Sequence, residues 1–348
     1  MAKRVIFSDL HFGDPSCSLS SQPVALGLRS YLWGLGEVKE LVLAGDILDA
    51  NISSLHTAIE GRNGSHSWPN QLGFRQWLSF LFENDKFDVE RIVYIPGNHD
   101  YIIWNILSTN EVFVEPVSQG KVPRNLPLME GTFLEPFIRG VAPGKVRDRF
   151  IVTYPDYEFD LPGHAVLVTH GHYLDEQQTL FKSLEKLIQA EGDKREAIRK
   201  FFIGSAQYEV VANAVSFMKN SRDLVKKAYK SLSWFFDAIG GSRGKPIDAS
   251  TLHAVEVYLF YFRNKQPDVY IYGHTHKAGH ANTKTLGSDK AKRLLPKDIE
   301  VWNDGSFLGA PSKSQAGTFI VTDDSPRIAS PIKLLEVDFK GTVNETVT

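Results

Sequence analysis

Five short, largely apolar runs recur along the chain, and each is followed at once by glycine or polar residues. The runs occupy residues 5–8, 41–44, 92–95, 166–169 and 269–272. Continuous apolar runs of this length, rich in leucine and β-branched residues, are typical of strands buried on both faces. Residues 24–36 and 71–84, which lie between the early runs, are predicted to be helical. The alternation predicts helices layered over a sheet, an α/β fold.

Residues 176–250 follow a different pattern. Leu180, Leu184, Leu187 and Ile188 are spaced to share one helical face, and similar spacing continues further on. We expect three to five helices here, inserted between two strands. The segment holds thirteen Lys and Arg against nine Asp and Glu. It is therefore either a solvated helical subdomain or a cap over an anionic substrate, set in a core formed by residues 1–175 and 251–348.

The C-terminal third returns to strand-like pieces at 299–302, 318–321 and 332–337. The 348 residues include 42% hydrophobic residues, and 39 Lys and Arg balance 41 Asp and Glu to a net charge of −2. These are ordinary globular values, which exclude wholesale disorder and low-complexity scaffolds. The near-neutral charge gives no reason to expect a dedicated nucleic-acid partner.

Cys17 is the only cysteine, which excludes an intramolecular disulfide and a cysteine zinc site and favours a cytoplasmic location. The apolar run at residues 5–7 is too short for a signal-peptide core. No apolar stretch approaches the roughly 18 residues that a membrane span needs. We therefore expect no transmembrane segment, while peripheral membrane contact and the oligomeric state stay open.

Residues with metal-binding chemistry follow each of the five apolar runs. In chain order they are Asp9-Leu10-His11, Gly45-Asp46 with Asp49, Gly97-Asn98-His99-Asp100, His170-Gly171-His172 and Gly273-His274-Thr275-His276. Ligands of open α/β sheets bind beyond the carboxyl ends of the strands. We therefore expect five strands to deliver oxygen and imidazole groups to one common edge.

This set of side chains suits two divalent cations about 3.5–4 Å apart, which need several imidazoles, a few hard oxygens and one bridging carboxylate. Asp46 is placed to supply the bridge. The i, i+2 pairs Asp9 with His11 and His274 with His276 point the same way from extended backbone. Glycine before a ligand lets the backbone turn sharply into a crowded site.

The motifs D-x-H, G-D-x-x-D, G-N-H-D, H-G-H and G-H-T-H, in this order, resemble those of the calcineurin-like metallophosphoesterase family. The resemblance spans residues 9–276, and residues 302–306 with 317–319 resemble the closing strands of that family. It implies a four-layer αββα sandwich with a helical insert. It also implies a hydrolase that cleaves a phosphomonoester, a phosphodiester or a nucleotide or pyrophosphate substrate through a metal-bridging hydroxide.

By motif position, the resemblance implies two metal sites that share one carboxylate. One site consists of Asp9, His11, Asp46 and His276, and the other of Asp46, Asn98, His170 and His274. His99 is then the acid that protonates the leaving oxygen, and Asp100 orients it. A site of oxygen and imidazole ligands admits Mn, Fe, Zn, Co or Ni, and we favour Mn.

Several residues have weaker signals. Asp49 either supports a metal ligand or begins a helix as its N-cap. Arg62 and His66 lie in a loop that follows the Asp46 strand, and with His172 they are candidate contacts for a small or medium phosphoester substrate. The alternative for the loop is an ordinary solvated segment.

Four other functions compete with this interpretation. The position of the insert resembles the cap of the UDP-diacylglucosamine pyrophosphatase branch, but that branch typically has Arg where this chain has His99. The protein Ser/Thr phosphatase branch usually has Arg after G-D-x-x-D, where this chain has Ala50, and G-N-H-E, where it has Asp100. A non-catalytic interaction module and a metal-dependent nuclease are less favoured.

Overall fold

The computed structural model describes most of the chain outside the predicted insert. The described residues are 2–49, 54–63, 68–100, 103, 106, 114–121, 131–133, 136–174, 247–263, 265–286, 294–309, 314–325 and 331–346. Contacts divide the chain into two units. The first comprises Met1–Gly171, Pro267–Ala281 and Ile299–Thr348, and the second His172–Gln266 and Asn282–Asp298. Nearly all of the predicted insert, 176–250, lies outside the described residues, so its role as a cap stays a prediction.

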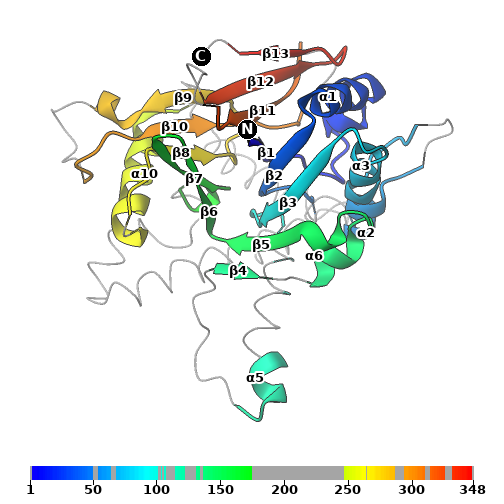
Figure 1. The fold of residues 1–348 in the computed structure, drawn as a ribbon, viewed down its shortest axis with the longest axis horizontal. Coiled ribbons are helices and arrows are strands. Elements are labelled where there is room, and N and C mark those ends of the chain that lie inside the picture. The colour runs from blue at the N-terminus through cyan, green and yellow to red at the C-terminus, as the bar shows by residue number, and fades with distance from the viewer. Residues whose placement is uncertain are drawn as a thin grey trace, which may run out of the picture. The chain divides into compact units, whose positions relative to one another are not determined.

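The larger sheet has eight strands in the order β13-β12-β11-β1-β2-β3-β5-β4 (Figure 1). Strands β1, β2, β3 and β5 run parallel to one another, and β4, β11, β12 and β13 are antiparallel to their neighbours. The bounds are β1 Lys3–Phe7, β2 Glu37–Ala44, β3 Asp88–Ile95, β4 Gly131–Phe133, β5 Phe150–Tyr154, β11 Gln315–Asp323, β12 Ile332–Asp338 and β13 Val343–Glu345.

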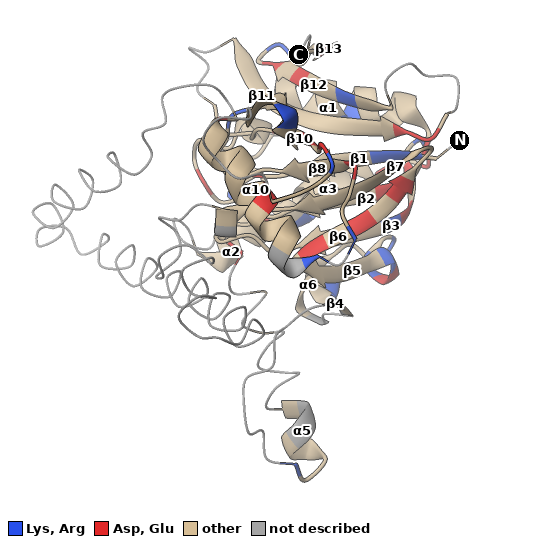
Figure 2. Ribbon diagram, turned by 90° about the vertical axis from the view of Figure 1, so that its left-hand side faces the viewer, with Lys and Arg blue, Asp and Glu red and all other residues tan. Residues whose placement is uncertain are grey.

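The smaller sheet has five strands in the order β6-β7-β8-β10-β9, in which β7, β8 and β10 are parallel. Its strands are β6 Asp156–Leu161, β7 His164–Thr169, β8 Val269–Tyr272, β9 Gly279–Asn282 and β10 Glu300–Asn303. At the edge strand β6, Glu158 and Asp160 are exposed while Phe159 and Leu161 are buried (Figure 2). Exposed charge on an edge strand discourages pairing with another chain.

The two sheets pack face to face, which corrects the expectation of a single sheet edge. β1, β2 and β3 belong to the larger sheet and β7 and β8 to the smaller one. One buried cluster joins side chains from both sheets, among them Ile6, Val42, Val168 and Ile271. These five strands and the three C-terminal strands were predicted. The carboxyl ends of the five meet, but they come from two sheets and not from one.

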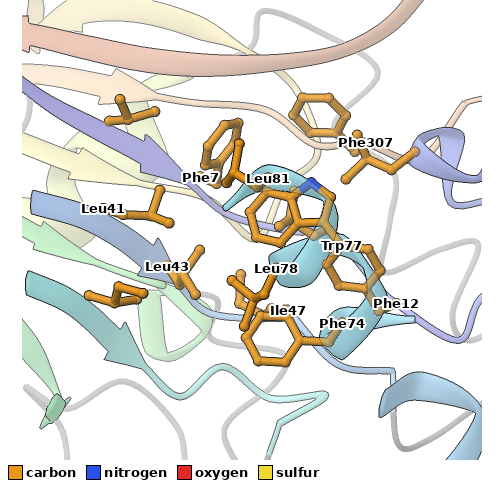
Figure 3. Packing of buried hydrophobic residues seen from close by; sticks show 14 of the residues in the cluster. Phe7, Phe12, Leu41, Leu43, Ile47, Phe74, Trp77, Leu78, Leu81 and Phe307 are labelled. Carbon is orange, nitrogen blue, oxygen red and sulfur yellow. The ribbon is translucent and has the colours of Figure 1, made fainter. Parts of the chain in front are cut away.

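Helices cover the other face of the larger sheet. The side chains of β1 alternate, so that Ile6 faces the smaller sheet while Phe7 faces helix α3 (Phe74–Leu81). Trp77 of α3 packs edge-on against Phe7, with ring centroids 6.0 Å apart, and lies 5.5 Å from the ring of Phe12 (Figure 3). Helix α1 (Gln22–Leu35) adds buried leucines to the same cluster. The predicted helices at 24–36 and 71–84 are confirmed.

Shorter helices complete the described part of the first unit. They are α2 (Leu55–Glu60), α5 (Glu115–Ser118), α6 (Pro136–Val141) and the 3-10 turns Ser18–Ser20 and Arg147–Arg149. α2 begins at Ser54, whose hydroxyl accepts from the backbone N–H of Thr57. Ser54, and not Asp49, therefore caps α2, the first described helix after β2.

The described part of the second unit contains helix α10 (Ala249–Phe262) and the 3-10 turns His172–Leu174 and Thr283–Leu286. Asp248 caps α10 by accepting from the backbone N–H of Thr251 at 2.9 Å. The carboxylate of Glu256, buried on α10, accepts from the N–H of Leu294 at 3.3 Å. Among the described helices of the chain, none is long and apolar enough to cross a membrane.

Cys17 gives a test of the core. It is 2% exposed, and burial raises the pKa of its thiol to about 12. Because only the thiolate reacts with disulfide reagents, a raised pKa means almost no reactive form at pH 8. We expect no reaction with Ellman's reagent in the native protein and one thiol per chain after unfolding in guanidinium chloride. Rapid native labelling would contradict this packing.

Candidate metal centre

Five of the predicted metal ligands sit at unusual backbone angles. Among the non-glycine residues that the structure describes, positive φ occurs only at Asp9 (50°), His11 (49°), Asp46 (52°), His274 (67°) and His276 (58°). L-residues enter this left-handed region at a cost of roughly 1–2 kcal/mol each. Such strain persists where the surrounding structure over-determines it, typically at functional sites.

Asp46 lies between two groups of side chains. Its Oδ2 is 3.3 Å from Nε2 of His170 and 3.9 Å from Nε2 of His11. Its Oδ1 accepts from the backbone N–H of His99 at 2.7 Å. Asp46 is therefore positioned between the two predicted metal sites, as a bridging carboxylate must be.

The first group gathers Asp9, His11 and His276. Oδ1 of Asp9 is 3.0 Å from Nε2 of His276 and 3.7 Å from Nε2 of His11, and the two imidazole Nε2 atoms are 3.3 Å apart. Nδ1 of His11 donates to Asp49 Oδ2 at 3.1 Å, because a carboxylate oxygen can only accept. That bond leaves the Nε2 of His11 to face the group.

The second group gathers Asp46, His170, His274 and Asn98. Nδ1 of His170 donates to the carbonyl oxygen of Ala44 at 3.0 Å, so its Nε2 faces inward. There it meets Asn98 Oδ1 at 3.0 Å as well as Asp46. Single ligand atoms of Asp46, His170 and His274 all lie within 4.8 Å of one another.

Three glycines make this density of side chains possible. A Cβ at Gly45 would collide with the ring of His170, and one at Gly97 would collide with Asp46 and His170. A Cβ at Gly273 would collide with Ser8 and Asp9. Each of these glycines stands directly before a strand-end motif, which is the role that the sequence predicted for them.

His99 is paired with Asp49 rather than with Asp100. Nδ1 of His99 lies 3.2 Å from Asp49 Oδ1, so the Asp49 carboxylate faces both His99 and His11. The side chain of Asp100 instead accepts backbone N–H groups from Ile47, Leu48 and Gly97. Asp100 thus fixes the two loops, and the expectation that it orients His99 is wrong.

The pKa values reflect this crowding of buried charge. Burial alone raises the pKa of Asp46, but the positive charges of His170 and His99 outweigh it and hold that pKa well below its usual value. Burial alone lowers the pKa of His170, but the charge of Asp46 raises it to about 9. Burial and the charge of Asp46 raise the pKa of Asp100 to about 6, although three N–H groups oppose the shift.

These donors fit divalent cations. The inward atoms are the Nε2 of His11, His170 and His276 and the carboxylate oxygens of Asp9 and Asp46, and neighbouring pairs of them lie 3.0–3.9 Å apart. Lone pairs this close repel one another unless protons or cations lie between them. Because a proton and a metal ion compete for the same nitrogen, metal binding would release protons from these imidazoles.

The sequence did not single out two side chains that support the centre. Asn303, fully buried at the end of β10, donates from Nδ2 to the carbonyl of Gly273 at 2.8 Å and to Thr275 Oγ1 at 2.9 Å. It therefore fixes the turn that carries His274 and His276. Asp304, the next residue, contacts Ser8. The only sequence signal was that residues 302–306 resemble closing strands of the family.

The described residues do not test the three candidate substrate contacts. Arg62 is exposed, and its backbone pairs with Gln71. His66 lies outside the described residues, and His172 is buried within the second unit. The nearby Trp68 donates from its indole nitrogen to the carbonyl of Ser20 and packs edge-on against Phe80. Roles for Arg62, His66 and His172 in substrate binding stay predictions.

Gly97 allows a direct test of the packing around Asp46. In Gly97→Ala the new methyl group would press on Asp46 and His170, which we expect to destabilise the protein by about 1–3 kcal/mol. The matched control is Gly34→Ala, where an added Cβ on helix α1 meets nothing within 4 Å and should stabilise by about 0.5–1 kcal/mol. Urea unfolding of the metal-free protein measures both, and a Gly97→Ala variant as stable as wild type would refute the close approach.

The comparison with protein families agrees with this chemistry. A profile of the calcineurin-like phosphoesterases matches residues 2–278. No curated protein sequence matches the chain. Among solved structures, a conserved uncharacterised protein of Streptococcus pneumoniae TIGR4, described as a predicted phosphoesterase, is 12% identical, with a TM-score of 0.28 over 99% of this chain and 98% of that one.

Two further structures are similarly distant. A metallophosphoesterase from Sphaerobacter thermophilus is 11% identical, with a TM-score of 0.37 over 97% of this chain and 88% of that one. A mutant cold-active protein tyrosine phosphatase is 13% identical, with a TM-score of 0.33 over 99% and 80%. TM-scores this low do not support a family assignment, which therefore rests on the sequence profile. That profile covers most of the chain and includes every predicted ligand, and the chain belongs to the calcineurin-like phosphoesterase family.

Proposed function

We propose that this phosphoesterase uses two divalent metal ions, held on either side of Asp46. The observation that carries the proposal is the position of the Asp46 carboxylate, whose Oδ2 faces His170 at 3.3 Å and His11 at 3.9 Å. Asp9, His11 and His276 would complete one site, and Asn98, His170 and His274 the other. When bound, two divalent cations lower the pKa of a coordinated water and neutralise charge on the phosphoryl oxygens.

The residues around the ligands have separate tasks in this proposal. Asp49 accepts from Nδ1 of His11 and keeps its Nε2 directed at the metal site. The carbonyl of Ala44 does the same for His170. Asn303 holds the turn of His274 and His276 through two hydrogen bonds. Substrate phosphate would bind where these ligand atoms converge.

His99 is the proposed acid for the leaving oxygen. Its side chain is 24% exposed, whereas the ligands Asp9, His11, Asp46 and His170 are almost completely buried. Asp49 Oδ1 lies 3.2 Å from its Nδ1, close enough for the carboxylate to stabilise a protonated imidazole that can donate to the leaving oxygen. The alternative is a ligand role, because atoms of His11, Asp46 and His99 also lie within 4.8 Å of one another.

The chemistry of the centre does not select one phosphoester class. A phosphomonoester, a phosphodiester and a nucleotide or pyrophosphate substrate all present phosphoryl oxygens to the two cations. Manganese as the metal and a cytoplasmic location stay predictions. The lipid-linked nucleotide alternative rests on the insert at 176–250, and no described contact supports it.

Metal dependence is the first test. We expect the purified protein to bind two metals per chain, to lose hydrolysis of p-nitrophenyl phosphate and bis-p-nitrophenyl phosphate after chelation, and to recover it with Mn²⁺. The reason is that the buried carboxylates of Asp9 and Asp46 would repel a phosphate anion unless cations neutralise them. Atomic emission spectroscopy gives the metal content, and the ratio of the two rates gives the preference between monoester and diester. No bound metal and no recovered turnover would exclude the proposal.

The role of His99 is tested by comparing leaving groups. A general acid contributes about 100- to 10,000-fold, and mostly when the leaving oxygen is basic. We expect His99→Gln to slow hydrolysis of phenyl phosphate far more than that of p-nitrophenyl phosphate, while metal content is retained. His164→Gln, an exposed histidine at the start of β7, is the control. Equal loss for both esters together with lost metal would make His99 a ligand.

A further inference from the structure

The hydroxyl of Ser8 lies between two buried carboxylates. Ser8 Oγ is 2.6 Å from Asp304 Oδ1, in hydrogen-bond contact with Asp9 Oδ2, and 3.4 Å from the carbonyl oxygen of Gly305. Ser8, Asp9 and Asp304 are each no more than 1% exposed. Ser8 and Asp9 follow β1 in the larger sheet, whereas Asp304 follows β10 in the smaller one. The contact therefore links the two sheets beside the candidate metal centre.

The number of hydrogens limits how these groups can be charged. A serine hydroxyl has one hydrogen, and an ionised carboxylate can only accept. If both carboxylates were ionised, Ser8 could donate to only one of them, and the other would face the lone pairs of its oxygen. One of the two carboxyl groups must therefore hold a proton and donate it to Ser8 Oγ.

The surroundings assign that proton to Asp304. Asp9 is the better placed of the two to be an anion, because its Oδ2 accepts from the backbone N–H of His274 at 2.8 Å. Its Oδ1 accepts no hydrogen bond among the described residues but lies 3.0 Å from the imidazole Nε2 of His276. Asp304 Oδ2 is buried with no hydrogen-bond partner among the described residues. An ionised oxygen in that position would be costly. Burial and the charge of Asp9 also raise the pKa of Asp304 well above its usual value.

We propose that Asp304 is a positioning residue, a neutral carboxylic acid that donates to Ser8 Oγ and thereby directs the Ser8 hydroxyl hydrogen to Asp9 Oδ2. Together with the N–H of His274, this contact fixes Oδ2 of Asp9. Oδ1 is then presented to His11 and His276, at the site where Asp9 would hold a metal. The inference rests on the proposed metal centre, and it adds Asp304 as a residue that acts through Ser8 and Asp9.

The test compares metal affinity in variants that differ in hydrogen bonding. Asp304→Asn is neutral and keeps an N–H donor for Ser8, whereas Asp304→Ala and Ser8→Ala break the chain of contacts. Loss of an outer contact to a metal ligand typically weakens metal affinity about 10- to 100-fold. We expect that loss in the two alanine variants and wild-type affinity in Asp304→Asn. The double alanine variant should lose no more than the worse single one, because both residues act through one contact.

Each variant is titrated with Mn²⁺ after chelation, and the melting temperature of the metal-free protein is recorded beside it. The control is Thr322→Ala. Thr322 is fully buried on β11 and pairs with Arg4 near the start of β1, whereas Ser8 follows the end of that strand. It should leave Mn²⁺ affinity unchanged, whatever its effect on the melting temperature.

Three results would overturn the inference while wild type still binds two metals. In the first, Asp304→Asn loses as much Mn²⁺ affinity as Asp304→Ala. In the second, Asp304→Ala binds Mn²⁺ as tightly as wild type. In the third, Thr322→Ala loses as much Mn²⁺ affinity as Asp304→Ala. Should Asp304→Ala not fold, Ser8→Ala and Asp304→Asn decide the same question. A wild-type protein that binds no metal would instead refute the proposed function and this inference with it.

Discussion

The structure depends on how negative charge is neutralised at the carboxyl ends of its parallel strands. Asp9, Asp46, Asp49, Asp100 and Asp304 are all buried in the first unit. Each is compensated differently. Asp49 pairs with two imidazoles, Asp100 with three backbone N–H groups, and Asp304 contacts a serine hydroxyl. Asp9 and Asp46 face several imidazole nitrogens at once, and these are the two carboxylates best suited to cations.

Local backbone strain and missing side chains make that arrangement possible. Five predicted ligands have positive φ, and glycines at 45, 97 and 273 leave room for their neighbours. Neither feature stabilises a hydrophobic core. A residue in the left-handed region costs free energy, and a glycine has no side chain to make apolar contacts. Buried strands such as β2 and β3, with their large apolar side chains, supply the stability that holds these turns.

The sequence predicted the strands well and their pairing poorly. Each of the five runs is apolar because both faces of its strand are covered. A continuous apolar run is a local pattern that is visible in the sequence. Whether β3 and β7 share a sheet depends on contacts between residues far apart in the chain, which periodicity does not report. That Asp49 and not Asp100 lies beside His99 has a similar cause. The position of Asp100 next to His99 in the sequence shows that its carboxylate is near, but the direction of its side chain depends on how the backbone turns.

The support from β10 was hidden for another reason. Asn303 and Asp304 are ordinary residues after an ordinary strand, and their importance comes from lying next to Gly273 and Ser8, which are distant in sequence. Only the packing of the two sheets brings them there.

The same packing has a consequence for stability. Predicted ligands at the ends of β1, β2 and β3 in one sheet face predicted ligands at the ends of β7 and β8 in the other. Cations bound between them would cross-link segments from residue 9 to residue 276. Since the unfolded chain has no such preformed site, metal binding free energy would add to folding free energy. The centre would then hold the two sheets together as well as bind substrate, so that loss of metal would loosen the geometry on which its chemistry depends.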